Sequence, residues 1–311
     1  MYQYILRRLL LTVPVVIGVS VIVFSIIRLL PGDPARALAG VQATPEYIEQ
    51  VRERYGLDEP IHVQYWNFIS NMARGDLGTS TFSSRPVTTE LGERFPRTLL
   101  LASVSLFIAT ILGVTAGIIS ATRRNSLFDN TSMFIALVGV AAPVFWLALM
   151  LQLLFSVQLR WLPPTGMGSI EHIILPSITL GLASAALMAR ITRSSMLDVL
   201  RQDFITTARA KGLAERVVVY KHALKNALIP VVTVLGLQFG ILLGGAVLTE
   251  TVFAWPGVGR LLVDAILRRD YPVVQGTVML LAFLFVIINL VVDIIYAFLD
   301  PRIHYQGQNE S

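Results

Sequence analysis

Apolar and polar residues alternate along this chain in long blocks, and six of the apolar blocks carry no charge over about the length of a membrane crossing. Roughly 20 helical residues, at 1.5 Å each, cross a hydrocarbon core of about 30 Å. The six runs are Leu9–Ile27, Leu99–Ala121, Met133–Leu159, Ile173–Ala189, Asn226–Thr249 and Tyr271–Val292. The fourth run is the shortest and contains Pro176. The pattern predicts an all-α integral membrane protein with six transmembrane helices.

The composition supports this prediction. Of the 311 residues, 54% are hydrophobic and 14% are charged, whereas soluble domains carry about 25% charged residues. There is no Cys, so neither disulfides nor thiolate metal sites can form. The net charge of +5 does not indicate nucleic-acid binding, because the basic residues flank apolar runs instead of lining one soluble face. The four His are far apart and form no metal motif; they are His62, His172, His222 and His304.

The first apolar run resembles a secretory signal, with Ala37–Ala39 as a possible cleavage site. The apolar region of a signal peptide is about 7–15 residues long. This run is longer and continues through Arg28–Leu30. We therefore expect residues 1–30 to be a retained transmembrane helix.

The distribution of Lys and Arg predicts the orientation, because these residues are held on the cytoplasmic side during insertion. With the N-terminus inside, cytoplasmic segments hold 12 of them and the short outer loops hold four. The outer four are Arg160, Arg260, Arg268 and Arg269. The long segment 31–98 carries seven Arg, but loops above about 60 residues cross the membrane largely regardless of charge. We expect both termini to be cytoplasmic.

The most cationic loop lies between the fourth and fifth runs, from Arg190 to Pro230. Asp203 can cap a short helix that starts at Phe204. Gly212 can adopt the left-handed conformation that ends such a helix. The loop 191–227 is thus predicted to hold a short helix outside the bilayer, available to a cytoplasmic partner.

Residues 31–94 are predicted to form a helical segment on the outer side. Thr44–Glu46 has the features of a helix start, and Gly56 can end that helix. A second helix is expected from Ile61 to Ala73, before the turn-rich Gly75–Gly78. This segment either caps the membrane bundle or forms a docking surface for something outside.

Glycines mark possible close contacts between helices. Gly113 and Gly117 form one GxxxG pair, which is a weak signal. Gly236, Gly240 and Gly244 recur every four residues, which is stronger because three in register allow contact over three turns. Packing within the chain, a subunit interface or a pore wall would each explain this face.

The loop after the fifth run is apolar and contains a turn. Its notable residues are Phe253, Trp255, Pro256, Gly257 and Gly259. Such a loop can fold back into the protein as an outer gate. It could equally form a belt of aromatic residues at the membrane interface.

Motifs for catalysis are missing from the sequence. None of the three Lys lies in a phosphate-binding GxxxxGK[ST] loop, and there is no GxSxG motif or Cys nucleophile. We therefore expect no enzyme activity, which leaves a passive pore, an ion-coupled carrier, or a subunit of a machine powered elsewhere. No ionisable residue lies mid-span, and no internal repeat is evident, which disfavours a carrier. Asp293 is the deepest acid, and we expect it to pair with a cation or a backbone group at the inner boundary.

The segment TTARAKG at Thr206–Gly212 resembles the cytoplasmic EAA loop of ABC importer permeases. Ala208, Gly212 and Leu224 agree with the broad motif, and the differences are shared by dipeptide, oligopeptide and glutathione permeases. Other stretches resemble the same branch, and together they cover nearly the whole chain: MYQYILRRLLLTVP at the start, LPGDP at Leu30–Pro34, GDLG at Gly75–Gly78, ERFPRTL at Glu93–Leu99, TRSSMLDVL at Thr192–Leu200, HALKNALIP at His222–Pro230 and FAWPGVGRLL with RRDYPVVQG within Phe253–Gly276.

The resemblance implies a type I ABC importer permease fold in the bacterial inner membrane, with five helices over 95–300 and a polar cytoplasmic tail over 301–311. The implied partners are a homologous second permease, two ABC ATPase subunits, an extracytoplasmic binding protein and membrane lipid, without nucleic acid. ATP and Mg would be bound by the ATPase subunits, so this chain would bind no cofactor.

The resemblance also assigns a coupling helix that contacts the ATPase. Its residues would be Asp203, Phe204, Thr206, Thr207, Ala208, Arg209, Ala210, Lys211 and Gly212. Arg209 and Lys211 would make charged contacts, while Ala208 and Gly212 would allow close approach. The implied substrates are dipeptides or short peptides, and glutathione, oligopeptides and nickel remain alternatives. An ion-coupled secondary carrier or a non-transporting scaffold is a further alternative.

Overall fold

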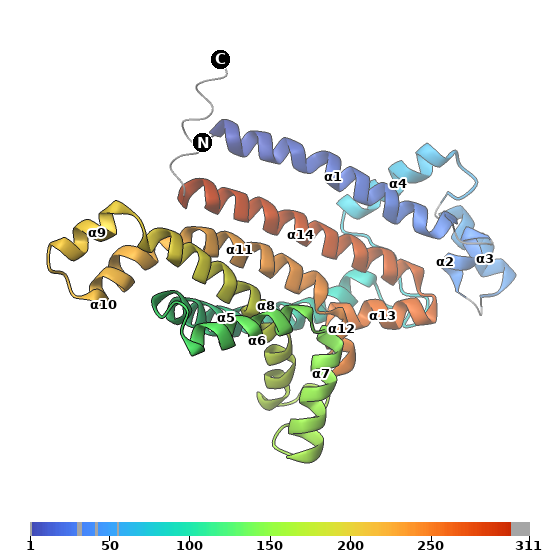
Figure 1. Cartoon of the computed structure of the whole chain (residues 1–311). Helices are drawn as coiled ribbons and strands as arrows, with labels where there is room; N and C mark the ends of the chain where they lie inside the picture. Colours follow the sequence, from blue (N-terminus) through green and yellow to red (C-terminus); the bar gives the residue numbers. More distant parts are fainter. Residues whose placement is uncertain (1, 30–32, 41–42, 55, 300–311) are drawn as a thin grey trace.

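Long helices lying side by side form the body of the protein (Figure 1). The structure is a computed structural model that describes residues 2–29, 33–40, 43–54 and 56–299. The long helices are α1 (Tyr2–Leu29), α5 (Val87–Thr122), α8 (Glu171–Leu200), α11 (Leu224–Gly245) and α14 (Tyr271–Leu299). Five spans in the described part of the chain are long and apolar enough to cross a membrane, and each includes one of these helices. The predicted all-α membrane fold is confirmed.

The third apolar run is not the single straight span that we predicted. It is broken into α6 (Leu127–Ala141) and α7 (Val144–Gln152), which continues as the π-helix η1 (Leu153–Gln158). The two halves are bent by 105°. Pro143 causes the break, because it has no N–H to donate and forces Ala142 into an extended conformation, with ψ 130°. The bent pair, counted as one span, brings the spans found in the described residues to six.

Two helices extend well beyond the predicted apolar runs. α8 continues past Ala189 to Leu200, so the cationic loop expected from residue 191 begins inside a helix. α5 runs for 36 residues without interruption through the expected domain boundary at 94/95. At 1.5 Å per residue α5 is roughly 54 Å long. The outer segment and the membrane domain therefore share one continuous rod.

α5 and α8 pack closely at the glycine pair that carried the weaker sequence signal. A Cβ atom at Gly113 would lie 2.7 Å from the carbonyl oxygen of Ala185, and one at Gly117 would lie 2.8 Å from that of Ala189. Only glycine permits this approach of two backbones.

The three glycines of α11 form a less regular contact. Gly236 lies against the side chain of Val292, and a Cβ atom at Gly240 would lie 3.4 Å from the ring of Phe285, both on α14. A Cβ atom at Gly244 would have nothing within 4 Å. The face therefore packs within the chain at two of its three positions, and it meets side chains instead of backbone.

The outer segment caps α1 and α14. It comprises α2 (Pro34–Ala39), α3 (Pro45–Arg54) and α4 (Ile61–Ala73), and the α4 bounds are those predicted. Gly56 and Gly75 are left-handed, with φ +56° and +82°, as expected of residues that end α3 and α4. The hydroxyl of Tyr65 on α4 lies 2.6 Å from that of Ser20 on α1, which ties the cap to the bundle.

The start of α1 and the end of α14 lie at the same end of the bundle, where α9 (Asp203–Ala210) projects (Figure 1). There the Arg8 guanidinium lies 3.0 Å from the Asp293 carboxylate, which confirms the predicted pairing of Asp293 with a cation. We call this the inner end, and we call the end that carries α2–α4 the outer end. Residues 30–32 of the LPGDP stretch and the tail 301–311 lie outside the described residues.

Candidate functional site

The predicted cytoplasmic helix is present as α9 at the inner end. Asp203 is its first residue and not its cap: Gln202 occupies the cap position, and no side chain there bonds to the helix. The C-terminal end follows the prediction. Gly212 has φ +74° and donates to the Arg209 carbonyl at 2.9 Å, while the Leu213 N–H reaches the Ala208 carbonyl at 3.4 Å. This paired bonding is the Schellman motif, which stops a helix sharply.

One stripe of α9 is buried in the chain itself. Ile205 is fully buried and Ala208 is 7% exposed. Both belong to an apolar cluster with Met196 of α8, Ile118 of α5 and Val218, which lies in the π-helix η2 (Val218–Ala223) just before α11. Ala208, which we expected to allow a partner to approach closely, thus faces its own bundle. Ile205 was absent from the predicted site, although its spacing of three from Ala208 indicates a shared helix face.

The remainder of α9 is exposed. Its exposed predicted residues are Asp203, Phe204, Thr206, Thr207, Arg209, Ala210, Lys211 and Gly212. Arg209 is engaged within the chain, because its guanidinium donates to both carboxylate oxygens of Glu215 at 2.6 and 3.1 Å. Glu215 begins α10 (Glu215–Val217), which leads through the π-helix η2 (Val218–Ala223) into α11. The ion pair clamps α9 to the segment that follows it.

A buried ion pair braces the helices behind α9. Asp129, at the start of α6, is 1% exposed and accepts two hydrogen bonds, at 2.6 and 2.7 Å, from the Arg193 guanidinium on α8. It also accepts the backbone N–H of Asn125 at 2.9 Å. The sequence analysis did not single out Asp129, because its partner lies 64 residues away.

The predicted outer loop folds back into the protein. It connects α12 (Val247–Val252) to α13 (Val258–Arg268). Phe253 and Trp255 are each 2% exposed, and the Trp255 indole donates to the Arg97 carbonyl on α5 at 3.1 Å. The loop is thus buried at the outer end, and its aromatic side chains do not form an interfacial belt. We call this buried loop, residues 253–257, the plug.

A buried carboxylate that the sequence analysis missed organises this plug. Glu250 is fully buried and accepts the Thr98 hydroxyl at 2.6 Å and the Arg260 backbone N–H at 3.0 Å. Thr98 in turn accepts the Val258 N–H at 2.8 Å. A Cβ atom at Gly257 would fall on the carboxylate itself. Burial raises the pKa of Glu250, although its hydrogen bonds oppose this, and the residue lies beyond the span that ends at Gly244.

Two parts of the chain match known protein families. Residues 113–305 match the family described as binding-protein-dependent transport system inner membrane component, and residues 1–102 match the N-terminal model of such components. The chain belongs to this permease family. Its relatives also show that it is an ABC importer permease of the dipeptide and glutathione branch.

Two curated relatives match almost end to end. The dipeptide transport system permease protein DppB of Alkalihalophilus pseudofirmus is 50% identical over 333 aligned positions, covering 98% of this chain and 100% of the relative. The glutathione transport system permease protein GsiC of Escherichia coli K12 is 52% identical over 306 positions, with the same coverage. This permease is therefore a multi-pass inner membrane protein.

Solved structures support the fold. An inward-facing MetNI methionine ABC transporter chain matches with a TM-score of 0.57 at 21% identity, over 68% of this chain and 96% of that one. An amino acid ABC transporter chain matches with a TM-score of 0.51 at 15% identity, over 76% and 98%. At these identities the likeness shows the architecture of the permease alone.

Proposed function

We propose that this permease forms part of an ATP-driven importer of dipeptides or short peptides, and that α9 is its coupling helix. The observation that carries the proposal is the placement of α9. Its Ile205 and Ala208 stripe is buried in the bundle, whereas Phe204, Thr207 and Lys211 are exposed at the end of the molecule. A helix so anchored transmits a push from a bound partner to α5 and α8.

The partners follow from the family, whose members work with a binding protein. We propose a second permease, two ABC ATPase subunits on the α9 side and a binding protein on the α2–α4 side. In this assembly the chain carries no catalytic centre and binds no cofactor, since ATP and Mg belong to the ATPase subunits. Both chain termini are cytoplasmic, which agrees with the Lys and Arg bias and with the common position of the α1 start and the α9 end.

The experiment compares two glycines with the same backbone strain. Gly212 and Gly75 have φ +74° and +82°, and a Cβ atom at either would meet nothing within 4 Å. Val at either position is strained. We expect Gly212→Val to abolish ATP-dependent uptake while the protein still inserts, and Gly75→Val to retain it. Gly212→Asn should keep uptake, because Asn tolerates this conformation. Normal uptake by Gly212→Val would refute the coupling role.

Glutathione is a second candidate substrate. The dipeptide permease alignment spans 333 positions, more than the 311 residues of this chain, so that relative carries additional residues. The glutathione permease aligns over 306 positions without such excess. Competition between labelled dipeptide and glutathione, measured in vesicles with the cognate binding protein, decides between them.

A further inference from the structure

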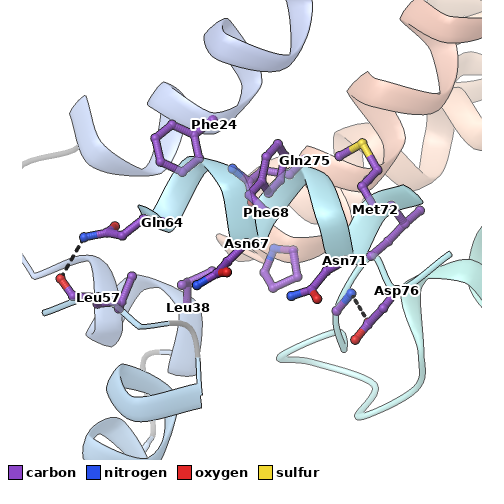
Figure 2. Close-up of a pocket in the computed structure, with 14 residues that line it drawn as sticks. Phe24, Leu38, Leu57, Gln64, Asn67, Phe68, Asn71, Met72, Asp76 and Gln275 are labelled. Atoms are coloured by element: carbon purple, nitrogen blue, oxygen red, sulfur yellow. Dashed lines mark hydrogen bonds between the residues drawn. The ribbon is translucent and has the colours of Figure 1, made fainter. Parts of the chain in front are cut away.

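Two hollows at the outer end lie next to each other beside α1, α4 and α14. The first, of about 470 Å³, is lined almost entirely by apolar side chains, among them Val16 and Ile17 of α1 and Phe283 of α14. The second, of about 280 Å³, lies between α4 and the outer ends of α1 and α14 (Figure 2). The hollows share the lining residues Met72, Leu77 and Gly276.

The two hollows follow one another along α1. On α1 the apolar hollow is lined at Val16 and the second hollow at Phe24, eight residues further on, which is roughly 12 Å of helix. The apolar hollow thus reaches further into the candidate spans of α1 and α14 than the second hollow does, and residues of the outer segment line both. An occupant of both would need an apolar chain in the membrane and a polar group at its surface.

Four amide side chains contribute to the lining of the second hollow. Figure 2 shows Asn67 and Asn71 projecting from one side of α4, one turn apart. Within the described part of the chain, neither side chain makes a hydrogen bond that would occupy its donors. Gln64 and Gln275 also line this hollow, and their amides donate to backbone carbonyls of the chain. The two Asn side chains can therefore donate to an anionic oxygen.

Among the described residues that line the second hollow, Asp76 is the only charged one. One of its carboxylate oxygens accepts the Gly78 N–H at 2.9 Å, and among the described residues it forms no ion pair. Asp76 belongs to the Gly75–Gly78 turn, to which the proposed transport function assigns no role. The lining thus favours an ammonium group and disfavours a net negative headgroup, since its described residues include no Lys or Arg.

We propose that this paired hollow binds one phospholipid with a primary ammonium headgroup, of the phosphatidylethanolamine type. An acyl chain occupies the apolar hollow, the phosphate accepts hydrogen bonds from Asn67 and Asn71, and the ammonium donates to Asp76. The bound lipid belongs to the leaflet on the α2–α4 side, and it fills the space between the outer segment and the membrane helices.

The test uses the full-length chain in nanodiscs with equal amounts of phosphatidylethanolamine, phosphatidylcholine and phosphatidylglycerol. After mild detergent extraction, retained lipid is identified by native mass spectrometry. We expect phosphatidylethanolamine to be retained at least roughly fivefold over either other lipid, since each hydrogen bond adds about a factor of five. Equal retention of all three classes would overturn the proposal.

Two variants localise the effect. Asp76→Asn can still accept the Gly78 N–H, so the turn is kept while the charge is lost, and we expect the preference over phosphatidylcholine to disappear. The matched control is Asp198→Asn, an exposed acid on α8 at the other end, which should change nothing. A phosphatidylethanolamine with a photoreactive acyl chain should label α1, α4 or α14. Labelling elsewhere, displacement by a peptide substrate, or a crosslink between two chains at the hollow would refute the lipid.

Discussion

At the inner end a short exposed helix is held by apolar side chains, whereas at the outer end a short buried loop is held by polar ones. Ile205 and Ala208 fix α9 and leave its remaining surface in water. Glu250 and Thr98 fix the plug, and nothing of either side chain reaches solvent beyond 1%. The difference concerns how much of each element's surface stays available for contact. Apolar anchoring on one stripe leaves a face free for docking, while a buried hydrogen-bond network needs every member in place.

The largest effect is expected at the plug. Gly257→Val would push methyl groups onto the Glu250 carboxylate, because there is no room even for a Cβ atom. We expect a loss of about 4 kcal/mol, or failure to fold, from overpacking combined with disruption of a buried polar group. Thermal unfolding in detergent measures the loss. Gly244→Ala, with open space around its new methyl, is the control and should keep the wild-type Tm. Equal Tm values for the two variants would show that the plug is loosely packed.

The apolar anchor comes second. Ile205→Ala removes a fully buried side chain from the inner cluster, which should cost about 3 kcal/mol. We expect α9 to become accessible to protease in the folded protein, with ATPase binding weakened. Phe204→Ala, in which a 39% exposed neighbour is truncated, should leave protease resistance unchanged. If both variants resist protease alike, α9 is held by something other than this stripe.

The buried carboxylate should make stability depend on pH. Burial raises the pKa of Glu250 above its ordinary 4.5, so the folded state holds the proton more tightly than the unfolded state. Its contribution to stability is complete below the unfolded value and is lost as the pH rises through the folded one. Glu250→Gln should remove this dependence, and Glu250→Leu should remove it too but be about 2 kcal/mol less stable than Glu250→Gln at every pH, because Thr98 loses its acceptor. The Tm of the wild type and of the two variants is measured from pH 4 to 8. Matching curves for the wild type and Glu250→Gln would exclude a role for the charge.

The smallest effect is expected at the exposed ion pair. Arg209→Gln should change stability by less than about 1 kcal/mol, since both partners are solvated. Its effect on uptake should be salt-dependent and matched by Glu215→Gln, because either change opens the same clamp. A large effect of Arg209→Gln without one from Glu215→Gln would mean that Arg209 contacts the ATPase directly.

The local signals in the sequence were sufficient for the apolar spans and for several helix ends. Glycine predicted the ends of α4 and α9, since it acts through its own backbone. Long-range pairings were not predictable. Glu250 meets Thr98 across 152 residues, and the partner of Asp129 lies on another helix. Apolar content likewise could not reveal the bend at Pro143, because both halves of that run are equally apolar.

The uninterrupted course of α5 has a mechanical consequence. Thr98 engages the plug and Ile118 lies in the cluster that anchors α9, so about 30 Å of one stiff rod separates them. A helix without a break between these two points moves largely as a rigid body. Because α5 has no break between these two points, a displacement of α5 at the α9 cluster would also displace Thr98 at the plug.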